Sequence, residues 1–154
     1  MSTVGTFSLC GADTITIADR LLTDLAAGEV AKLSYAAELA TVKAGKNGNT
    51  IYVQNAAGFQ AALELRVIRG SKDDQFLQSE VTAYRETPTL YVVKNCTLAK
   101  AVGDGAGTVV TDTYTLTGGV PSKQVEVVVN LEGDTEQALS VYTWIFGSTT
   151  RAIG

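Results

Sequence analysis

The side chains of this chain that could do chemistry are carboxylates, because the sequence contains no histidine. The commonest general base, the commonest metal-binding imidazole and every Ser-His or Cys-His nucleophile pair are therefore missing. Paired carboxylates can still act as general acid and base, or bind a hard cation. Two stretches bring carboxylates together: Asp73-Asp74, and Glu132-Gly133-Asp134 with Glu136.

Both stretches have simpler explanations. Adjacent residues of a helix diverge by about 100°, and two carboxylates in a first helical turn are favoured by the helix dipole. The acidic stretch at 132–136 lacks the length and ligand spacing of an EF-hand, so a solvated turn explains it better. The glycine-rich Gly103–Gly107 has neither the following Lys-Ser/Thr nor the helix of a phosphate-binding loop. We expect no catalytic residue, cofactor or metal, and therefore no enzyme.

The two cysteines, Cys10 and Cys96, lie far apart and form no CxxC pair. Two small buried thiols are the simpler interpretation in a reducing compartment, and a disulfide within the chain or between copies is the alternative. The first residues lack a charged and hydrophobic signal sequence, and no apolar run reaches the length of a membrane span. These features indicate a protein made and folded in a cytoplasm, with no membrane partner.

The length and composition of the chain limit the classes of protein to which it can belong. A chain of 154 residues suits one domain, and charged residues make up only 18% of it, below the usual quarter. Self-association explains so little charge, since assembly hides surface; a β-rich domain with an uncharged polar exterior explains it equally well. The net charge of −4 comes without a cluster of Lys and Arg, so tight binding of nucleic acid is not expected.

The stretch from Phe59 to Tyr84 says most about the architecture. Residues 61–68 alternate with the two-residue period of a half-buried strand. Gly70 then breaks the strand, Ser71 offers an N-cap hydroxyl, and Asp74 lies in the first turn of the helix that follows. Leu77, Val81 and Tyr84 give that helix, expected from Ser71 to about Arg85, one apolar stripe.

Elsewhere the sequence predicts strands and turns. We expect strands at Val4–Cys10, Thr14–Ile17, Val30–Tyr35, Thr50–Gln54, Thr89–Val93 (with an extension over 96–98), Val109–Thr117, Gln124–Leu131 and Leu139–Phe146. Asp19–Gly28 is a helical turn or an ordered loop, the segment around Gly118–Ser122 is a turn, and Ser148–Gly154 is a tail. The fold class is mainly β: a two-sheet antiparallel sandwich or open barrel with one flanking α-helix, forming a single domain over residues 1–154.

One segment of this domain should protrude. Ala36–Asn49 ends in turn-forming residues, and Asn47-Gly48 favours a tight hairpin turn because both residues tolerate positive φ. Lys43 and Lys46 make its tip basic. The tip is either a solvated turn or a contact surface.

In this order, the elements resemble the tail tube proteins of tailed bacteriophages, most closely those of contractile tails, with type VI secretion tube proteins as fold relatives. The resemblance is carried, over nearly the full chain, by G-E-V-A-K-L-S-Y, K-N-G-N, L-E-L-R-V-I-R-G-S-K-D-D-Q-F-L, V-E-V-V-V-N-L-E-G-D and S-V-Y-T-W-I-F. It implies a structural subunit that stacks as hexameric rings around a channel. Its partners would be further copies of itself and the sheath, tape-measure and baseplate proteins. DNA would pass without specific binding, in a virion tail assembled in the host cytoplasm.

The resemblance also implies roles for residues. Lys43, Lys46, Asn47 and Asn49 would contact the neighbouring ring, and Ser2–Phe7 and Ser148–Gly154 would join contacts between rings or subunits. Lumen-facing residues would be Glu64, Glu126 and Asn130, with Gln54 and Gln60 also placed inward. The lumen strands would be either Thr50–Gln54 with Phe59–Arg69, or Val109–Leu116 with Gln124–Leu131. The alternatives are a tube subunit of a phage-tail-like bacteriocin or secretion system, and a monomeric β-sandwich binding module or hydrolase.

Overall fold

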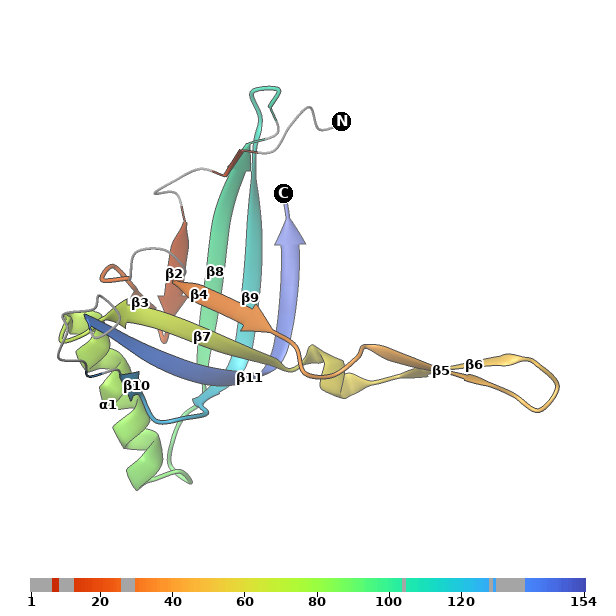
Figure 1. Cartoon of the computed structure of the whole chain (residues 1–154), viewed down its shortest axis with the longest axis horizontal. Helices are drawn as coiled ribbons and strands as arrows, with labels where there is room; N and C mark the ends of the chain where they lie inside the picture. The colour runs from red at the N-terminus through yellow and green to blue at the C-terminus, as the bar shows by residue number, and fades with distance from the viewer. Residues whose placement is uncertain (1–6, 9–12, 26–29, 104, 128, 130–137) are drawn as a thin grey trace.

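The structure, a computed structural model, describes residues 7–8, 13–25, 30–103, 105–127, 129 and 138–154 (Figure 1). In chain order its elements are β1 (Phe7–Ser8), β2 (Thr14–Ile17), β3 (Arg20–Leu21), β4 (Ala31–Ser34), β5 (Ala40–Ala44), β6 (Thr50–Gln54), the 3-10 helix η1 (Ala56–Phe59), β7 (Ala61–Ile68), α1 (Lys72–Glu86), β8 (Lys94–Gly103), β9 (Val109–Pro121), β10 (Glu126–Val127) and β11 (Leu139–Ile153). The predicted class, mainly β with antiparallel strands and one flanking helix, is confirmed. α1 is too short and too polar to cross a membrane.

One bent sheet makes both layers of the sandwich. Its order is β3-β2-β8-β9-β11-β7-β4, and every pair in it is antiparallel. We call β2, β8, residues 109–117 of β9 and residues 148–153 of β11 the longitudinal layer. We call β4, β7, residues 119–121 of β9 and residues 139–146 of β11 the crossing layer. In Figure 1 the two sets of strands run nearly at right angles, the arrangement of an orthogonal sandwich in which strands pass from one layer to the other.

Glycines make the corner possible. Gly118 has φ +70° and Gly147 stands opposite it, where β9 and β11 both change layer. The β8–β9 register shifts between Lys94 and Cys96 at the same level, as a β-bulge requires. A Cβ on Gly119 would lie 2.3 Å from the ring of Phe146 and 2.9 Å from the carbonyl oxygen of Lys94. Only glycine fits at that position.

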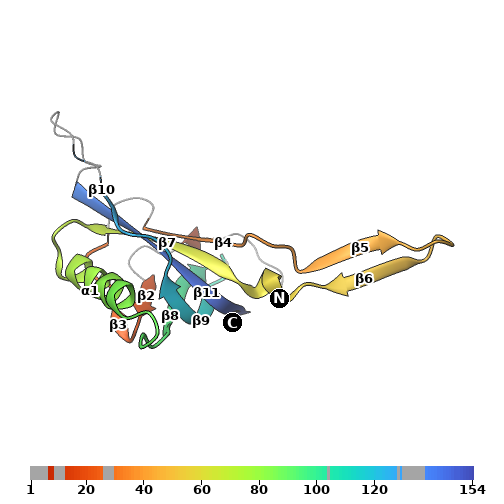
Figure 2. The ribbon, with the colours of Figure 1, turned by 90° about the horizontal axis from the view of Figure 1, so that it is seen from below.

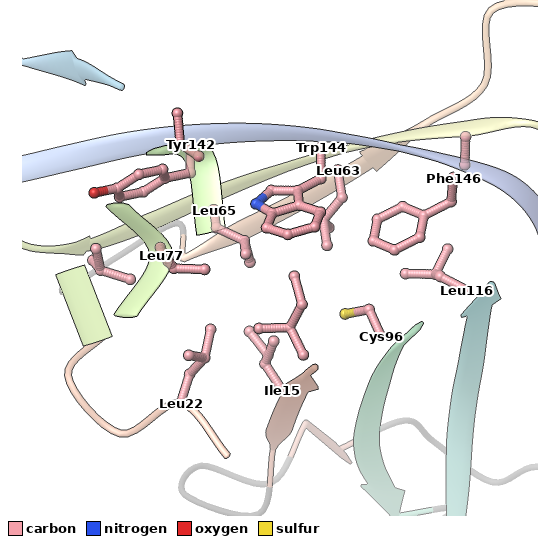
Figure 3. Close-up of a cluster of buried hydrophobic side chains, with 14 residues drawn as sticks. Ile15, Leu22, Leu63, Leu65, Leu77, Cys96, Leu116, Tyr142, Trp144 and Phe146 are labelled. Carbon is pink, nitrogen blue, oxygen red and sulfur yellow. The ribbon is translucent and has the colours of Figure 1, made fainter. Parts of the chain in front are cut away.

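The core lies between the layers and is closed at one end by α1 (Figure 3). From the crossing layer, Tyr142, Trp144 and Phe146 are almost fully buried, as expected for a core face of the last strand. Cys96 and Leu116 approach them from the longitudinal layer (Figure 3). Leu77 and Val81 of α1 complete the core, and the alternating burial of β7 follows the predicted period of two.

Three predictions about local structure are wrong. Thr89–Val93 is a turn followed by irregular chain rather than a strand, and its Leu90 and Val92 are exposed. Gly118–Pro121 continues β9 through the corner, and Ser148–Ile153 continues β11, because each segment finds a partner strand. For Asp19–Gly28, expected as a helical turn or an ordered loop, the described part (Asp19–Leu25) is the loop alternative with the short strand β3 in it.

Among the described residues, the strands of neither candidate lumen set pair with each other. β6 pairs with β5, and β9 pairs with β8 and β11. η1 separates β6 from β7, so these two strands do not form a hairpin. Predictions that rest on residues 2–6, Cys10, residue 128 or residues 130–137 lie outside the described residues.

Candidate assembly surfaces

The described residues contain no group of three or more Cys, Asp and Glu side chains placed to hold a metal ion. The two carboxylates at the start of α1 instead hold the fold together. Ser71 is the N-cap, and its Oγ accepts a hydrogen bond from Asp74 N at 3.2 Å. Asp74 in turn accepts hydrogen bonds from Gly70 N at 2.8 Å, from Ser140 Oγ at 3.2 Å and from the hydroxyl of Tyr142. The helix start is thereby tied to β11.

Asp73 anchors a different segment. Its side chain is fully buried and accepts hydrogen bonds from Thr23 N at 2.6 Å, Asp24 N at 2.7 Å and Arg20 Nε at 3.0 Å. Burial alone raises the pKa of this carboxyl, but the hydrogen bonds from Asp24, Thr23 and Arg20 outweigh it and hold the pKa below its usual value. A carboxylate with all its bonds satisfied in this way is structural.

The hairpin β5–β6 projects away from the sandwich (Figures 1 and 2). All ten residues of its strands are exposed. Val42 and Tyr52 stand opposite each other on one face and are 60% and 75% exposed; Ile51 and Val53 lie on the other face. A two-stranded hairpin is marginally stable by itself in water, and exposed apolar patches of this kind mark interaction sites. The hairpin is the most prominent candidate contact surface.

The hairpin is held in place at its base and closed at its tip. Asn55 N donates to Leu39 O at 2.8 Å, and Gly58 packs so closely on Glu38 and Leu39 that an added Cβ would lie 2.7 Å from Glu38 O. At the tip Gly48, with φ +83°, donates to Gly45 O at 3.0 Å. The sequence-predicted contact residues Lys43, Lys46, Asn47 and Asn49 all lie in this distal, exposed part.

A second candidate surface was missed by sequence reasoning. On one face of the longitudinal layer, the side chains that the structure describes are uncharged and mostly small, because neighbouring strands bring them into register. One row across the layer, for example, is Thr16, Thr97, Thr115 and Thr150. The signal was present in V-T-D-T-Y-T-L-T, where every second residue from 111 to 117 is threonine. We call it the threonine face; its members are Thr14, Thr16, Thr97, Ala99, Ala101, Gly103, Thr111, Thr113, Thr115, Thr117, Ser148, Thr150, Ala152 and Gly154, with Val109 and Leu21 at its margins.

The charged side chains of the same strands point to the opposite face. There Arg151 Nε and Nη2 each donate to an oxygen of Asp112 at 2.8 Å, and Lys100 Nζ lies 2.9 Å from Asp13 Oδ2. The hydrogen bond from Arg151 holds the pKa of Asp112 below its usual range. The layer thus segregates its charges, by strand periodicity, to the side that faces the crossing layer.

The predicted lumen-facing residues lie elsewhere. Glu64 is on β7, in the crossing layer, and its Oε1 lies 3.2 Å from Arg66 Nη2. Glu126 is exposed on β10, beside the first half of β11. Asn130 is outside the described residues. The structure therefore does not bring Glu64 or Glu126 together with the threonine face.

Comparison with known proteins shows which solved structures share the fold of this chain. No family model and no curated protein matches the chain. Among solved structures, the chain is similar to one in the anti-feeding prophage cap, described as a tube-terminating cap (TM-score 0.60, 10% identity, 96% of this chain and 91% of that one). It is also similar to a chain in the PVC sheath/tube terminator of an extracellular contractile injection system (TM-score 0.61, 14% identity, 97% of this chain and 99% of that one). A chain in the PVC sheath-tube complex of such a system is similar as well (TM-score 0.63, 10% identity, 96% of this chain and 92% of that one). Nearly the whole chain therefore shares the fold of chains found in contractile tube assemblies.

Proposed function

We propose that this chain is a structural subunit of the tube of a contractile, tail-like assembly, in which copies form hexameric rings that stack around a channel. The observation that carries the proposal is the projecting hairpin, whose apolar side chains Val42, Tyr52, Ile51 and Val53 are exposed on both faces. A monomer gains nothing from such an element, whereas a neighbouring copy can cover it. The fold likeness over 96–97% of the chain supports the same conclusion.

Within such a tube, the distal hairpin with Lys43, Lys46, Asn47 and Asn49 would contact the adjoining ring. Sheath, tape-measure and baseplate proteins would be the other partners, and DNA would pass through the channel in a phage virion. A phage-tail-like injection particle is the alternative setting, and it is favoured by the fold likeness to chains of the anti-feeding prophage and of an extracellular contractile injection system. A genome-filled head on particles that contain this chain identifies the phage; a headless particle identifies the injection system.

A ring at the end of the tube is a second candidate function, because two of the three similar structures named above are described as a cap or a terminator. Copy number separates the two roles. Quantitative mass spectrometry of isolated particles is expected to find this chain in many copies, increasing with tube length. A copy number equal to one ring, independent of tube length, would assign it to the end of the tube instead.

A further inference from the structure

We propose that Asn47 is a self-modifying site: in unassembled subunits the backbone of Gly48 converts the Asn47 side-chain amide to a carboxylate, without an enzyme or a cofactor. The site lies at the tip of the β5–β6 hairpin (Figures 1 and 2). Its chemistry depends only on these two residues and on the turn that holds them. Its consequence for assembly rests on the proposed function, since it needs the tip to contact an adjoining ring.

The reaction joins two neighbouring groups of the chain. The backbone nitrogen of Gly48 attacks Cγ of Asn47, and the new C–N bond closes a succinimide ring. The side-chain nitrogen of Asn47 leaves as ammonia, together with the proton that the Gly48 nitrogen gives up. Water then opens the ring at either carbonyl and leaves aspartate, or isoaspartate, in which the backbone runs through the former side chain. Ammonia is lost and water is gained, with no net oxidation or reduction.

The residue that follows each asparagine decides how easily this ring closes. Asn-Gly occurs once in the sequence, at Asn47-Gly48, and glycine has no Cβ to crowd the attacking nitrogen. Asn49 is also exposed, but it is followed by Thr50, whose two branches at Cβ shield its backbone nitrogen. The sequence therefore makes Asn47 the more reactive of the two asparagines at the tip.

The hairpin restrains the attacking nitrogen only weakly. Gly48 N donates to Gly45 O at 3.0 Å, and this hydrogen bond must break before the nitrogen can attack. The bond lies at the far end of a two-stranded ribbon whose strand residues are all exposed, and such a ribbon is marginally stable by itself. Opening of the tip therefore costs much less free energy than unfolding of the sandwich.

Two further asparagines are held by the fold. Asn55 is the N-cap of η1, and its N–H donates to Leu39 O at 2.8 Å. Asn95 lies within β8, and its carbonyl oxygen accepts a hydrogen bond from Ala18 N at 2.9 Å. The nitrogen that would attack the Asn95 side chain belongs to Cys96, which is only 1% exposed. Both asparagines serve as internal controls, since they experience the same solution as the hairpin tip.

Conversion changes the hairpin tip in two ways. The new carboxylate enters the segment that carries Lys43 and Lys46, and it offsets part of their positive charge. Isoaspartate also adds a methylene to the backbone inside the turn that Gly48 N and Gly45 O close. A subunit that stays unassembled therefore loses affinity for an adjoining ring, whereas a subunit within a tube has its tip covered and keeps its amide.

Peptide mapping by mass spectrometry tests the site in unassembled subunits held at neutral and at mildly alkaline pH. Conversion at Asn47 should be at least about tenfold faster than at Asn49 or Asn95, and faster at the higher pH, because the deprotonated backbone nitrogen is the nucleophile. Gly48→Asn should slow conversion of Asn47 at least about tenfold. This variant should keep the turn, since asparagine tolerates positive φ and an added Cβ meets no described atom within 4 Å. Equal rates at the three asparagines would overturn the site.

Assembly of the incubated subunits tests the consequence. Wild-type subunits with converted Asn47 should need at least about a tenfold higher concentration to assemble, whereas Gly48→Asn subunits incubated in parallel should assemble as they did when fresh. Assembly of fully converted subunits at the concentration of fresh ones would overturn the consequence while leaving the proposed function intact. A fresh wild-type chain that never forms rings would overturn the proposed function and the consequence together, and the conversion rates would still decide the site.

Discussion

Arg20 Nε lies 3.0 Å from Oδ1 of Asp73, 53 positions later in the chain, and the other oxygen of this buried carboxylate accepts the backbone N–H groups of Thr23 and Asp24. One side chain thus fixes the loop after β3 against the start of α1. The helix is the lid of the core, so this relationship links the closure of the sandwich to a single carboxylate.

Asp73→Ala is expected to lower the free energy of unfolding by about 2–4 kcal/mol, because it removes a buried carboxylate that accepts the N–H groups of Thr23 and Asp24 and pairs with Arg20. Urea denaturation of the unassembled subunit measures this change. Glu86→Ala, an exposed carboxylate at the other end of α1, is the control and should change little. A similar small change for both variants would contradict the anchoring role.

The same carboxylate predicts a pH dependence. The folded-state pKa of Asp73 is below its usual 3.8, so its contribution is complete above about pH 4–5 and is lost as the pH falls through the folded-state value. The stability difference between the wild-type chain and Asp73→Asn should therefore shrink below about pH 4. A difference that stays constant down to about pH 2 would show that the charge of Asp73 does not matter.

Alanine substitutions of two glycines at the corner should differ in their effect on the stability of the subunit. Gly119→Ala places a Cβ against the Phe146 ring and the Lys94 carbonyl, and should cost about 1–3 kcal/mol or more. Gly147→Ala meets its nearest described atom only at 4.0 Å and should stay within about 1 kcal/mol of the wild-type chain. Thermal denaturation of both variants decides the matter, and equal melting temperatures would refute the packing account of the corner.

The apolar side chains of the hairpin should matter for assembly and not for folding. The double variant Val42→Thr/Tyr52→Thr keeps β-propensity, and both side chains are largely exposed. We expect an unchanged melting temperature of the subunit and at least about a tenfold higher concentration for assembly, equivalent to about 1.4 kcal/mol. Leu90→Thr, a 77% exposed leucine outside the hairpin, controls for a general loss of apolar surface. Assembly at the wild-type concentration would exclude a contact role for this face of the hairpin.

Lys43 and Lys46 of the hairpin should contribute to assembly through their positive charge. If Lys43 and Lys46 meet acidic groups of a neighbouring ring, raising the ionic strength from about 0.05 to about 0.5 M should weaken assembly of the wild-type chain. It should weaken assembly of Lys43→Gln/Lys46→Gln much less. Light scattering at both salt concentrations measures this, and an identical salt response of the two proteins would assign the lysines to solvent.

Much of this architecture could be predicted from local signals. The two-residue period of 61–68, the break at Gly70 and the cap at Ser71 predicted β7 and α1 to within a residue or two. The errors come from tertiary context. Gly118-Gly119 is turn-like by composition yet lies within a strand, since β11 supplies a partner and Phe146 occupies the space of a side chain. The threonine face depends on the register of four strands, which no single stretch of sequence encodes.

Negative-stain electron microscopy of the purified chain at increasing concentration tests the central claim most directly. We expect hollow rings of uniform diameter that stack into tubes as the concentration rises. Single compact particles of monomer size at every concentration, from a chain that is folded by circular dichroism, would contradict it.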